Sequence, residues 1–182
     1  MTAHVLPPDA LSAPVPDPEV LAFRAAMRKL AGAVSLLTVG SGDNRTGLTA
    51  TSVTSLSVDP PTLIVCVNRT ASARAELART RTFAINLLRP HHQHLAERFA
   101  GRHGASGAQR YEGAEWTKLQ TGAPVLADAL AVFDCEIEES LERHSHLIII
   151  GRVRAVRITE EAAPLLYWAG SFRTLENLPP QR

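Results

Sequence analysis

A run of small hydroxyl side chains is the feature of this sequence best suited to binding chemistry. The segment TGLTATSVTSLSVDPP, residues 46–61, carries seven serines and threonines and holds no lysine, arginine or aromatic residue. A strand whose polar side only faces solvent explains threonine, which favours strands, but it does not explain the serines. Hydroxyl and backbone groups along a strand can hydrogen-bond a planar heterocycle with alternating donors and acceptors. The segment therefore predicts a ligand site, with a solvent-facing strand as the alternative.

A second candidate for binding is the segment CVNRTASARAEL, residues 66–77. Asn68 ends an apolar strand, and Ser72 stands where a helix would begin. The first turn of a helix offers free N–H groups to an anion, and Arg69 and Arg74 add positive charge. An ordinary capped helix is the alternative interpretation.

The histidines carry weaker signals. His91, His92 and His94 lie close together, but no carboxylate or cysteine motif of metal-binding spacing accompanies them, so no metal site is predicted. His146 precedes the strand LIIIG, where a structural role and a functional one both remain open. The motifs GxGxxG, GxxxxGK[ST], HExxH, CxxC and GxSxG are absent, so the usual dinucleotide, triphosphate and protease sites are unsupported.

Composition limits the class of protein. The chain has 182 residues, 45% of them hydrophobic, and a formal net charge of +1, which fits one globular domain and gives no argument for nucleic acid or a membrane surface. Cys66 and Cys135 lie in apolar runs, as buried reduced thiols do. Residues 1–17 lack a secretory signal pattern, and their proline and alanine content predicts a disordered or draped arm. No apolar run reaches the ~18 residues of a membrane span, so a cytoplasmic protein is expected.

The elements that would position these residues follow from periodicity and turn signals. Asp17 and Pro18 are a strong helix start, and the apolar spacing predicts an amphipathic helix with one buried face over 18–31. Later segments alternate between strand and helix patterns, with an irregular stretch over 101–124. The predicted strands cover 33–40, 45–58, 62–68, 82–88, 129–143 and 145–159, the further helices 72–79 and 91–101, and the tail 165–175 one more strand and a turn.

Three successive strands between residues 33 and 68 argue against a doubly wound sheet, which needs regular alternation of strands and helices. Many strands, few helices and turn signals between them favour a closed antiparallel barrel with helices packed outside.

Several segments, taken in order, resemble the flavin reductase-like family, the flavin-binding split-barrel reductases that serve two-component monooxygenases. The matching pieces are FRAAMRKLAGAVSLLTV, GLTATSVTSLSVDPPTLIVCVNRTAS, FAINLL, ERFAG, and SHLIIIGRV followed by LLYW. The resemblance runs from Phe23 to about Leu175. It implies a mainly β, Greek-key split barrel with a few flanking helices over 18–176, followed by a tail over 177–182.

The resemblance also implies the binding residues and a homodimer with flavin near the subunit interface. Three segments match those that border the flavin: Thr49, Ala50, Thr51, Ser52 and Val53, extended by Ser55; Cys66, Val67, Asn68, Arg69 and Ser72, which hold the ribityl and phosphate; and Phe83, Ala84, Asn86 and Leu87. His146 and Tyr167 match residues near the nicotinamide. The chain departs from the family at His144-Ser145, where Gly-Asp is frequent, and at the closing YWAGSF.

The activity implied by the resemblance is NAD(P)H-dependent reduction of FAD or FMN. A hydride passes from nicotinamide C4 to flavin N5, and the protein orients the two rings. NADH is the favoured donor and NADPH the alternative, and a separate flavin-dependent oxygenase would receive the reduced flavin. Three other functions remain open: a flavin carrier or sensor without turnover, a split-barrel oxidase of a phosphorylated vitamin, which needs a denser basic cluster, and a structural barrel module.

Overall fold

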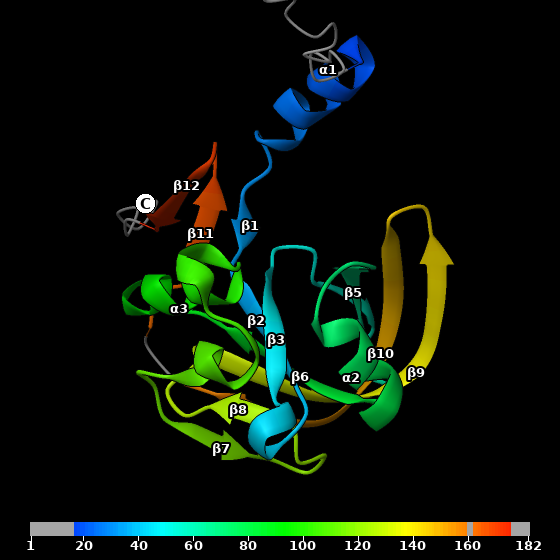
Figure 1. Cartoon of the computed structure of the whole chain (residues 1–182), viewed down its shortest axis with the longest axis vertical. Helices are drawn as coiled ribbons and strands as arrows, with labels where there is room; N and C mark the ends of the chain where they lie inside the picture. The colour runs from blue at the N-terminus through cyan, green and yellow to red at the C-terminus, as the bar shows by residue number, and fades with distance from the viewer. Residues whose placement is uncertain (1–16, 160–161, 176–182) are drawn as a thin grey trace, which may run out of the picture.

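The computed structural model describes residues 17–159 and 162–175 of the chain. Its centre is a seven-stranded antiparallel sheet in the order β3-β2-β6-β9-β10-β5-β4, drawn in Figure 1. The strands run Gly32–Ala33 (β1), Ser35–Val39 (β2), Thr46–Ala50 (β3), Thr54–Ser57 (β4), Thr62–Asn68 (β5), Thr82–Leu87 (β6), Trp116–Lys118 (β7), Pro124–Leu126 (β8), Ala131–Arg143 (β9), His146–Ile158 (β10), Leu165–Trp168 (β11) and Ser171–Thr174 (β12). The helices are Pro18–Met27 (α1), Ala73–Thr80 (α2) and Gln93–Phe99 (α3), with shorter turns at Gly42–Asn44 (η1), Pro90–His92 (η2), Arg102–Gly104 (η3) and Gly107–Tyr111 (η4).

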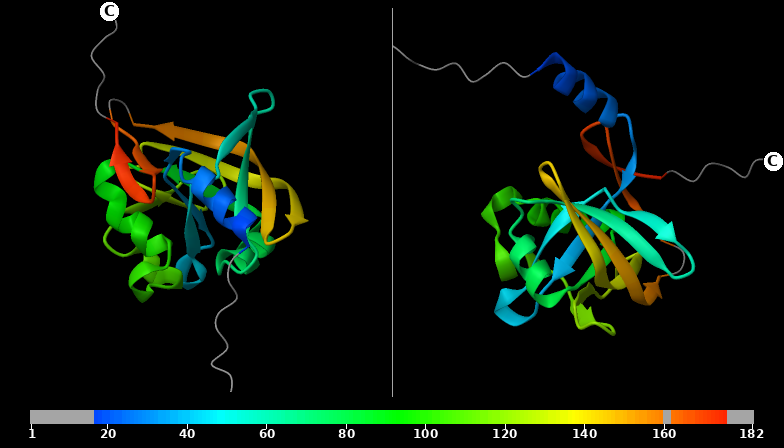
Figure 2. Two further views of the ribbon diagram at one scale, coloured as in Figure 1. Left: turned by 90° about the horizontal axis from the view of Figure 1, so that it is seen from above. Right: turned by 90° about the vertical axis from the view of Figure 1, so that its right-hand side faces the viewer.

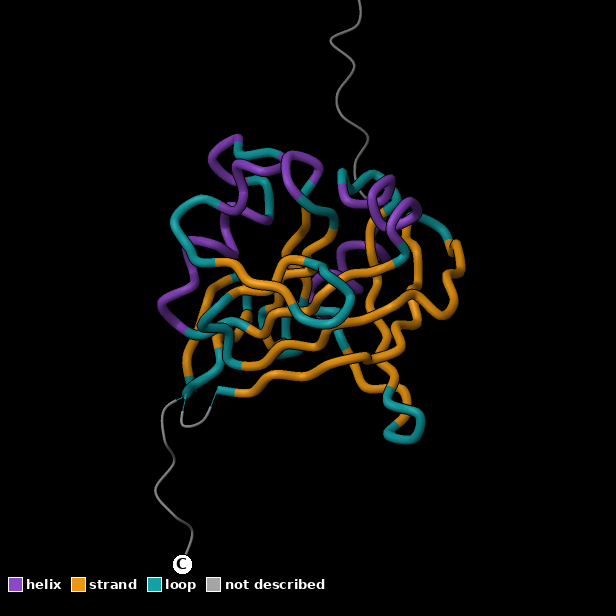
Figure 3. Tube along the Cα trace, turned by 90° about the horizontal axis from the view of Figure 1, so that it is seen from below, coloured by secondary structure: helices purple, strands orange, loops and turns teal. Residues whose placement is uncertain are grey.

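The sheet curls around one apolar core, which makes it a split β-barrel, as predicted. Leu37, Val65, Ile85 and Ile149 come from four different strands and belong to one buried cluster, which α2 joins through Leu77. Helices and helical turns lie outside the strands, as the colours in Figure 3 show. The mainly β prediction is therefore confirmed, and the strand at 62–68 has the predicted bounds.

A second core lies on the other face of β2, β6 and β9, where α3 and η4 cover the sheet. Phe99, Tyr111 and Trp116 pack there with ring centroids 4.6–5.8 Å apart. The Tyr111 hydroxyl donates to the carbonyl of Thr46, and burial raises the pKa of this phenol. This core fixes the start of β3, which leads into the hydroxyl-rich segment.

The hydroxyl-rich segment differs from the single strand predicted over residues 45–58. It divides into β3 and β4, with residues 51–53 unpaired between them. In one continuous strand, Leu56 and Val58 would share the face of Ala50, but Ala50 is buried whereas Leu56 and Val58 are 50% and 88% exposed. The break occurs because β3 pairs with β2 whereas β4 pairs with β5, so the chain must cross from one edge of the sheet to the other.

Helix α1 begins as predicted and ends earlier. Asp17 accepts a hydrogen bond from the Glu19 N–H at 2.8 Å, and Pro18 is its first residue. The helix ends at Met27, and no residue of α1 is buried, so the predicted buried face is wrong for this chain alone. Figures 1 and 2 show α1 standing away from the barrel, beyond β1 and the β11-β12 hairpin. An amphipathic pattern predicts an apolar face but does not say what covers it.

The tail forms more structure than the predicted strand and turn. Residues 165–174 form the hairpin of β11 and β12, and β1 pairs with β11 to complete a three-stranded sheet. The irregular stretch contains the short pair β7-β8. The predicted arm, apart from Asp17, and the tail 177–182 lie outside the described residues. Within those residues, no helix combines the length and apolar character that a membrane crossing requires.

Candidate functional site

The crossing at residues 51–53 is held to β5 by one side chain. The Ser52 hydroxyl donates to the Cys66 carbonyl at 3.1 Å and accepts from the Cys66 N–H at 3.2 Å. Because β4 pairs with β5 only from Thr62 to Ile64, the backbone of Cys66 lacks a strand neighbour on this side, and Ser52 takes that place. Ser52 is exposed and Cys66 half-buried, so this junction is open to a ligand.

The register of β5 and β10 places His146 beside this junction. His146 pairs with Asn68, and Ile148, two residues later in β10, pairs with Cys66, two residues earlier in β5. Side chains two apart on a strand share a face, so His146, Asn68 and Cys66 lie on the same side of the sheet. Nδ1 of His146 lies 2.9 Å from the Ser145 hydroxyl. The structure therefore brings Ser52 and His146, which are 94 residues apart in sequence, to the same end of β5 as Cys66 and Asn68.

Ser52, Cys66, Asn68 and His146 form a strip, the hydroxyl strip, and charged side chains lie at one end of it. Arg69 donates its backbone N–H to the Ser145 carbonyl at 2.9 Å and its guanidinium to the His144 carbonyl at 3.2 Å. Asn68 Oδ1 accepts from the N–H and hydroxyl of Thr70, which shapes the turn into α2. Ser72 immediately precedes α2, and its hydroxyl lies 3.3 Å from that of Thr46. Positive charge and turn geometry thus adjoin the hydroxyl strip.

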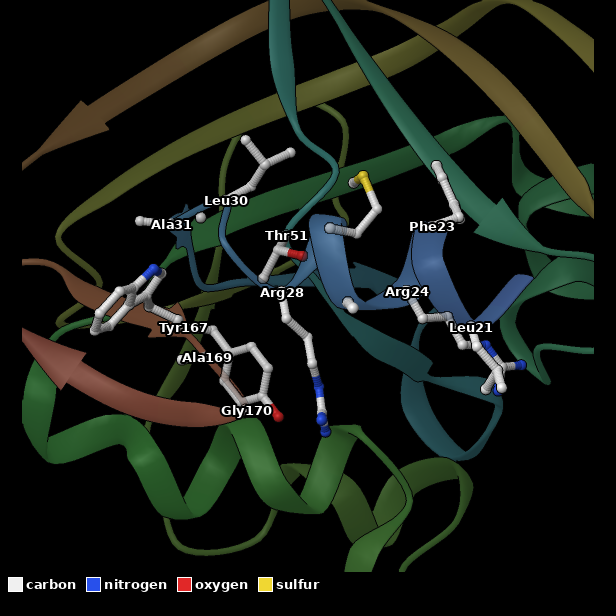
Figure 4. A pocket seen from close by; sticks show the side chains of 14 residues that line it. Leu21, Phe23, Arg24, Arg28, Leu30, Ala31, Thr51, Tyr167, Ala169 and Gly170 are labelled. Atoms are coloured by element: carbon white, nitrogen blue, oxygen red, sulfur yellow. The ribbon is translucent and has the colours of Figure 1, made fainter. Parts of the chain in front are cut away.

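Thr51 and Tyr167 meet in a separate hollow of about 810 Å³, shown in Figure 4. Helix α1 forms one side of this hollow, and the turn between β11 and β12 forms another. Gly32 pairs with Tyr167, and a Cβ atom on Gly32 would lie 3.0 Å from the Cβ of Thr51. The glycine therefore permits the close approach of the hydroxyl segment to the tyrosine strand. Arg28 also lines this hollow.

The remaining residues of the hydroxyl segment have different surroundings. Val53, Ser55 and Leu87 line a mostly apolar cavity of about 450 Å³ beside the barrel core. Thr49 donates its hydroxyl to the Ala96 carbonyl of α3 at 2.6 Å, and Ala50 is largely buried. Thr49 and Ala50 therefore fix the segment in place, while Thr51 and Ser52 present groups outward.

Four of the residues predicted to border the flavin are fully buried in this chain, so their contact with flavin stays a prediction. Val67, Phe83, Ala84 and Asn86 each have 0% exposure. Phe83 fills the space over Gly151, where a Cβ atom would lie 2.5 Å from the phenylalanine ring. The two cores cover both faces of β6, so the alternating side chains from Phe83 to Asn86 do not reach the surface of this chain. Val67 and Phe83 belong to the barrel core, Ala84 belongs to the second core, and Asn86 bonds to β2 and β8.

The histidine cluster contains a carboxylate that sequence reasoning missed. Asp128 accepts from Nε2 of His91 at 2.9 Å and of His92 at 3.0 Å, and the three residues are close enough to hold a metal ion. His92 Nδ1, however, accepts from the Arg89 N–H at 3.2 Å, so the neutral ring carries its proton on Nε2 and has no lone pair there for a metal. In this arrangement, the bonds from His91 and His92 to Asp128 hold η2 against the loop after β8. Asp128 follows His91 by 37 residues, so no spacing rule finds it.

This cluster predicts a decline of stability in weak acid. Burial lowers the pKa of His92 below its ordinary 6.5, although Asp128 opposes the shift. Burial acts to raise the pKa of Asp128, but its bonds to the histidines prevail and lower that pKa. Because the unfolded chain takes up the His92 proton first, stability falls as pH decreases from about 6.5 toward the folded pKa. Melting temperatures between about pH 7.5 and pH 5.5 should fall more steeply in the wild type than in His92→Gln. The exposed His91→Gln is the control, and equal slopes for wild type and His92→Gln would contradict the expectation.

The strip of hydroxyl, amide and imidazole groups fits a flat heterocycle that carries a phosphate. Asn68 and His146 are exposed on one face of the sheet, Ser52 lies beside them on the Cys66 backbone, and Arg69 and Arg74 line the hollow at one end. Hydride transfer between bound rings requires orientation and no catalytic carboxylate pair. Sequence reasoning missed Glu142, which lies 2.7 Å from Arg74, and Arg28 in the hollow of Thr51. Their exposed positions on β9 and after α1 give no sequence signal.

Comparison with known proteins gives a consistent result. The model of the flavin reductase like domain matches residues 27–176. An FMN reductase (NADH) of Methylorubrum extorquens is 46% identical over 162 residues, 87% of this chain and 93% of the relative. The NADH:FAD oxidoreductase of Streptomyces globisporus has a solved structure with a TM-score of 0.80 and 28% identity, covering 94% of this chain and 100% of that one. The flavin reductase component of a bacterial two-component tryptophan halogenase gives a TM-score of 0.79 and 31% identity over 87% of this chain and 99% of that one. This chain belongs to the flavin reductase-like family.

Proposed function

We propose that this protein reduces FMN with NADH and releases the reduced flavin to a separate flavin-dependent oxygenase. The protein is an NADH-dependent flavin reductase, as the family match and its named relatives indicate. The single observation in the structure that carries the proposal is the open junction where Ser52 and the backbone of Cys66 adjoin His146. FMN is proposed over FAD because the relative at 46% identity is named for FMN. Supply to an oxygenase is proposed because the tryptophan halogenase relative is the reductase component of a two-component system.

The chain's own residues supply positioning. The bound pair would supply the redox chemistry, with nicotinamide C4 as the hydride donor and flavin N5 as the acceptor, so that NADH would become NAD⁺ and the flavin would be reduced. Thr51, Ser52 and the Cys66 backbone are proposed to lie along the isoalloxazine and ribityl, with Val53, Ser55 and Leu87 beside them. Asn68, Arg69 and Ser72 are proposed near the phosphate. His146 and Tyr167 are proposed to orient the nicotinamide, and a solved structure of the Streptomyces globisporus relative contains NAD and FAD fragments.

We also propose a homodimer, because α1 and the turn that follows it expose apolar side chains. The proposed location is the cytoplasm. Phe23 and Leu30 are 65% and 64% exposed, and Leu21 is 48% exposed. An exposed apolar face of this kind is typical of an interface. A second copy of the chain would cover it beside the hollow that holds Thr51 and Tyr167, so the partner would adjoin the flavin. Light scattering should give the mass of two chains, and the mass of one chain would contradict this proposal.

The function is tested by anaerobic absorbance at the flavin band. Purified protein, excess FMN and NADH should bleach the flavin much faster than the same mixture without protein. FAD in place of FMN, and NADPH in place of NADH, should each react more slowly. A spectral shift on adding flavin without bleaching would indicate a carrier or sensor, and neither response would leave only the fold in common with the family.

Replacing His146 by alanine should raise the KM for NADH about two- to tenfold and leave kcat at saturating NADH nearly unchanged. The expected size corresponds to the loss of one hydrogen bond of ordinary strength, made equally in the ground and transition states. Steady-state kinetics at saturating FMN measures both constants. Ser145→Ala is the matched control, since it removes the hydroxyl beside Nδ1 and keeps the ring. Loss of folding in His146→Ala would show that the residue is structural.

A further inference from the structure

One carboxylate engages both arginines at the end of the hydroxyl strip. Glu142 of β9 places one oxygen 2.7 Å from Nη2 of Arg74 and the other 3.5 Å from Nη2 of Arg69. Arg74 belongs to α2 and Arg69 to the turn before it, so Glu142 connects the β9-β10 hairpin to the start of α2. All three side chains are nearly half exposed.

The arginines also line a small open hollow of about 380 Å³. Asn68, Thr70, His144 and Ser145 form the rest of it. A phosphate in this hollow needs the same guanidinium groups that Glu142 now holds, since bidentate bonds from arginine to carboxylate and to phosphate use the same donors. Half-exposed ion pairs contribute little, so exchange of the carboxylate for a phosphate costs little.

We infer that Glu142 is a specificity-determining residue that competes with the flavin phosphate for Arg69 and Arg74. This inference rests on the proposed function, which places the phosphate beside Arg69. With Glu142 present, the phosphate must displace a built-in anion and then lie near its negative charge. The carboxylate thus lowers the affinity for phosphorylated flavins and makes their release easier, as a diffusible product requires. Riboflavin, which lacks the phosphate, does not meet this competition.

The test is flavin affinity of the full-length Glu142→Gln variant, measured by fluorescence quenching with FMN and with riboflavin. FMN affinity should increase about two- to fivefold, the range expected for one exposed ion pair, and riboflavin affinity should stay unchanged. The gain should shrink at high salt, because exposed charges are screened. Glu138→Gln is the matched control: Glu138 is an exposed glutamate of the same strand without an ion pair among the described residues.

The arginines provide the second measurement. In an Arg69→Gln, Arg74→Gln background, Glu142→Gln should no longer change FMN affinity. Equal changes in affinity for FMN and riboflavin would overturn the inference. Weaker FMN binding in Glu142→Gln would also overturn it, because Glu142 would then be orienting the arginines for the phosphate. If the wild type bound neither flavin, the proposed function itself would fail. If the wild type bound both flavins and Glu142→Gln left both affinities unchanged, only the inference about Glu142 would fail.

Discussion

Replacing Asn86 by leucine should lower the free energy of unfolding by about 2–4 kcal/mol. Asn86 is fully buried, and its amide nitrogen donates to the Leu36 carbonyl at 3.2 Å and lies 3.0 Å from the Thr38 hydroxyl. Its carbonyl accepts from the N–H of Leu126 at 2.8 Å. Leucine leaves that buried N–H without an acceptor, and an unmade buried bond costs more than an exposed one. Urea unfolding of both proteins measures the difference.

The comparison variant is Asn68→Ala, because the resemblance implied cofactor binding for both asparagines. Asn68 is exposed, and its side chain bonds only to Thr70 within the described residues, so its loss should cost less than about 1 kcal/mol. We expect Asn68→Ala to weaken flavin binding and Asn86→Leu to leave the affinity of the folded protein unchanged. A stable Asn86→Leu protein with weakened flavin binding would instead support the contact that the resemblance implied.

Much of the fold could be predicted because local signals and packing agree. The strand over 62–68 is wholly apolar between a Pro-Pro turn and Asn68, and its observed bounds are the predicted ones. The long strands β9 and β10 alternate or are apolar throughout, so both were predicted to within two residues at each end. In these segments the hydrophobic pattern, the turn residues and the final pairing all favour one structure.

The sequence-based predictions fail where the structure of a segment depends on a distant part of the chain. Nothing within residues 45–58 shows that β3 and β4 pair with different strands, so the crossing at Ser52 could not be predicted. The apolar spacing in α1 predicts a helix with one apolar face, but it does not predict what covers that face. Burial of Asn86 is hidden for a similar reason, because its acceptors and donors come from β2 and β8.

The candidate site likewise combines features that the sequence predicts with features that depend on contacts between distant segments. The hydroxyl segment places an exposed serine at position 52, and its binding of a ligand stays a prediction. The proximity of Glu142 to Arg74 depends on the β9-β10 hairpin reaching the start of α2, a contact 68 residues apart in sequence. Cys135 is buried as its apolar surroundings predicted, and burial, with the neighbouring Asp134, raises the pKa of its thiol to about 12, whereas Cys66 is only half-buried.

Replacing Ser52 by leucine should weaken flavin binding at least about tenfold, or about 1.4 kcal/mol. The variant loses both bonds to the Cys66 backbone and places a bulky side chain on the proposed flavin surface. Because Ser52 is exposed, the free energy of unfolding should fall by no more than about 1 kcal/mol. Fluorescence titration with FMN and urea unfolding measure the two quantities independently.

Two further variants separate the loss of the Cys66 bonds from the added bulk as causes of weaker flavin binding. Ser52→Ala removes the hydroxyl without adding bulk, so an affinity between those of wild type and Ser52→Leu would assign part of the effect to the Cys66 bonds. Ser140→Leu adds the same bulk at an exposed serine of β9, which β10 separates from β5, and should leave flavin affinity unchanged. Unchanged affinity in a folded Ser52→Leu protein would remove the crossing between β3 and β4 from the site. The hollow lined by Thr51 and Tyr167 would then be the proposed flavin site instead.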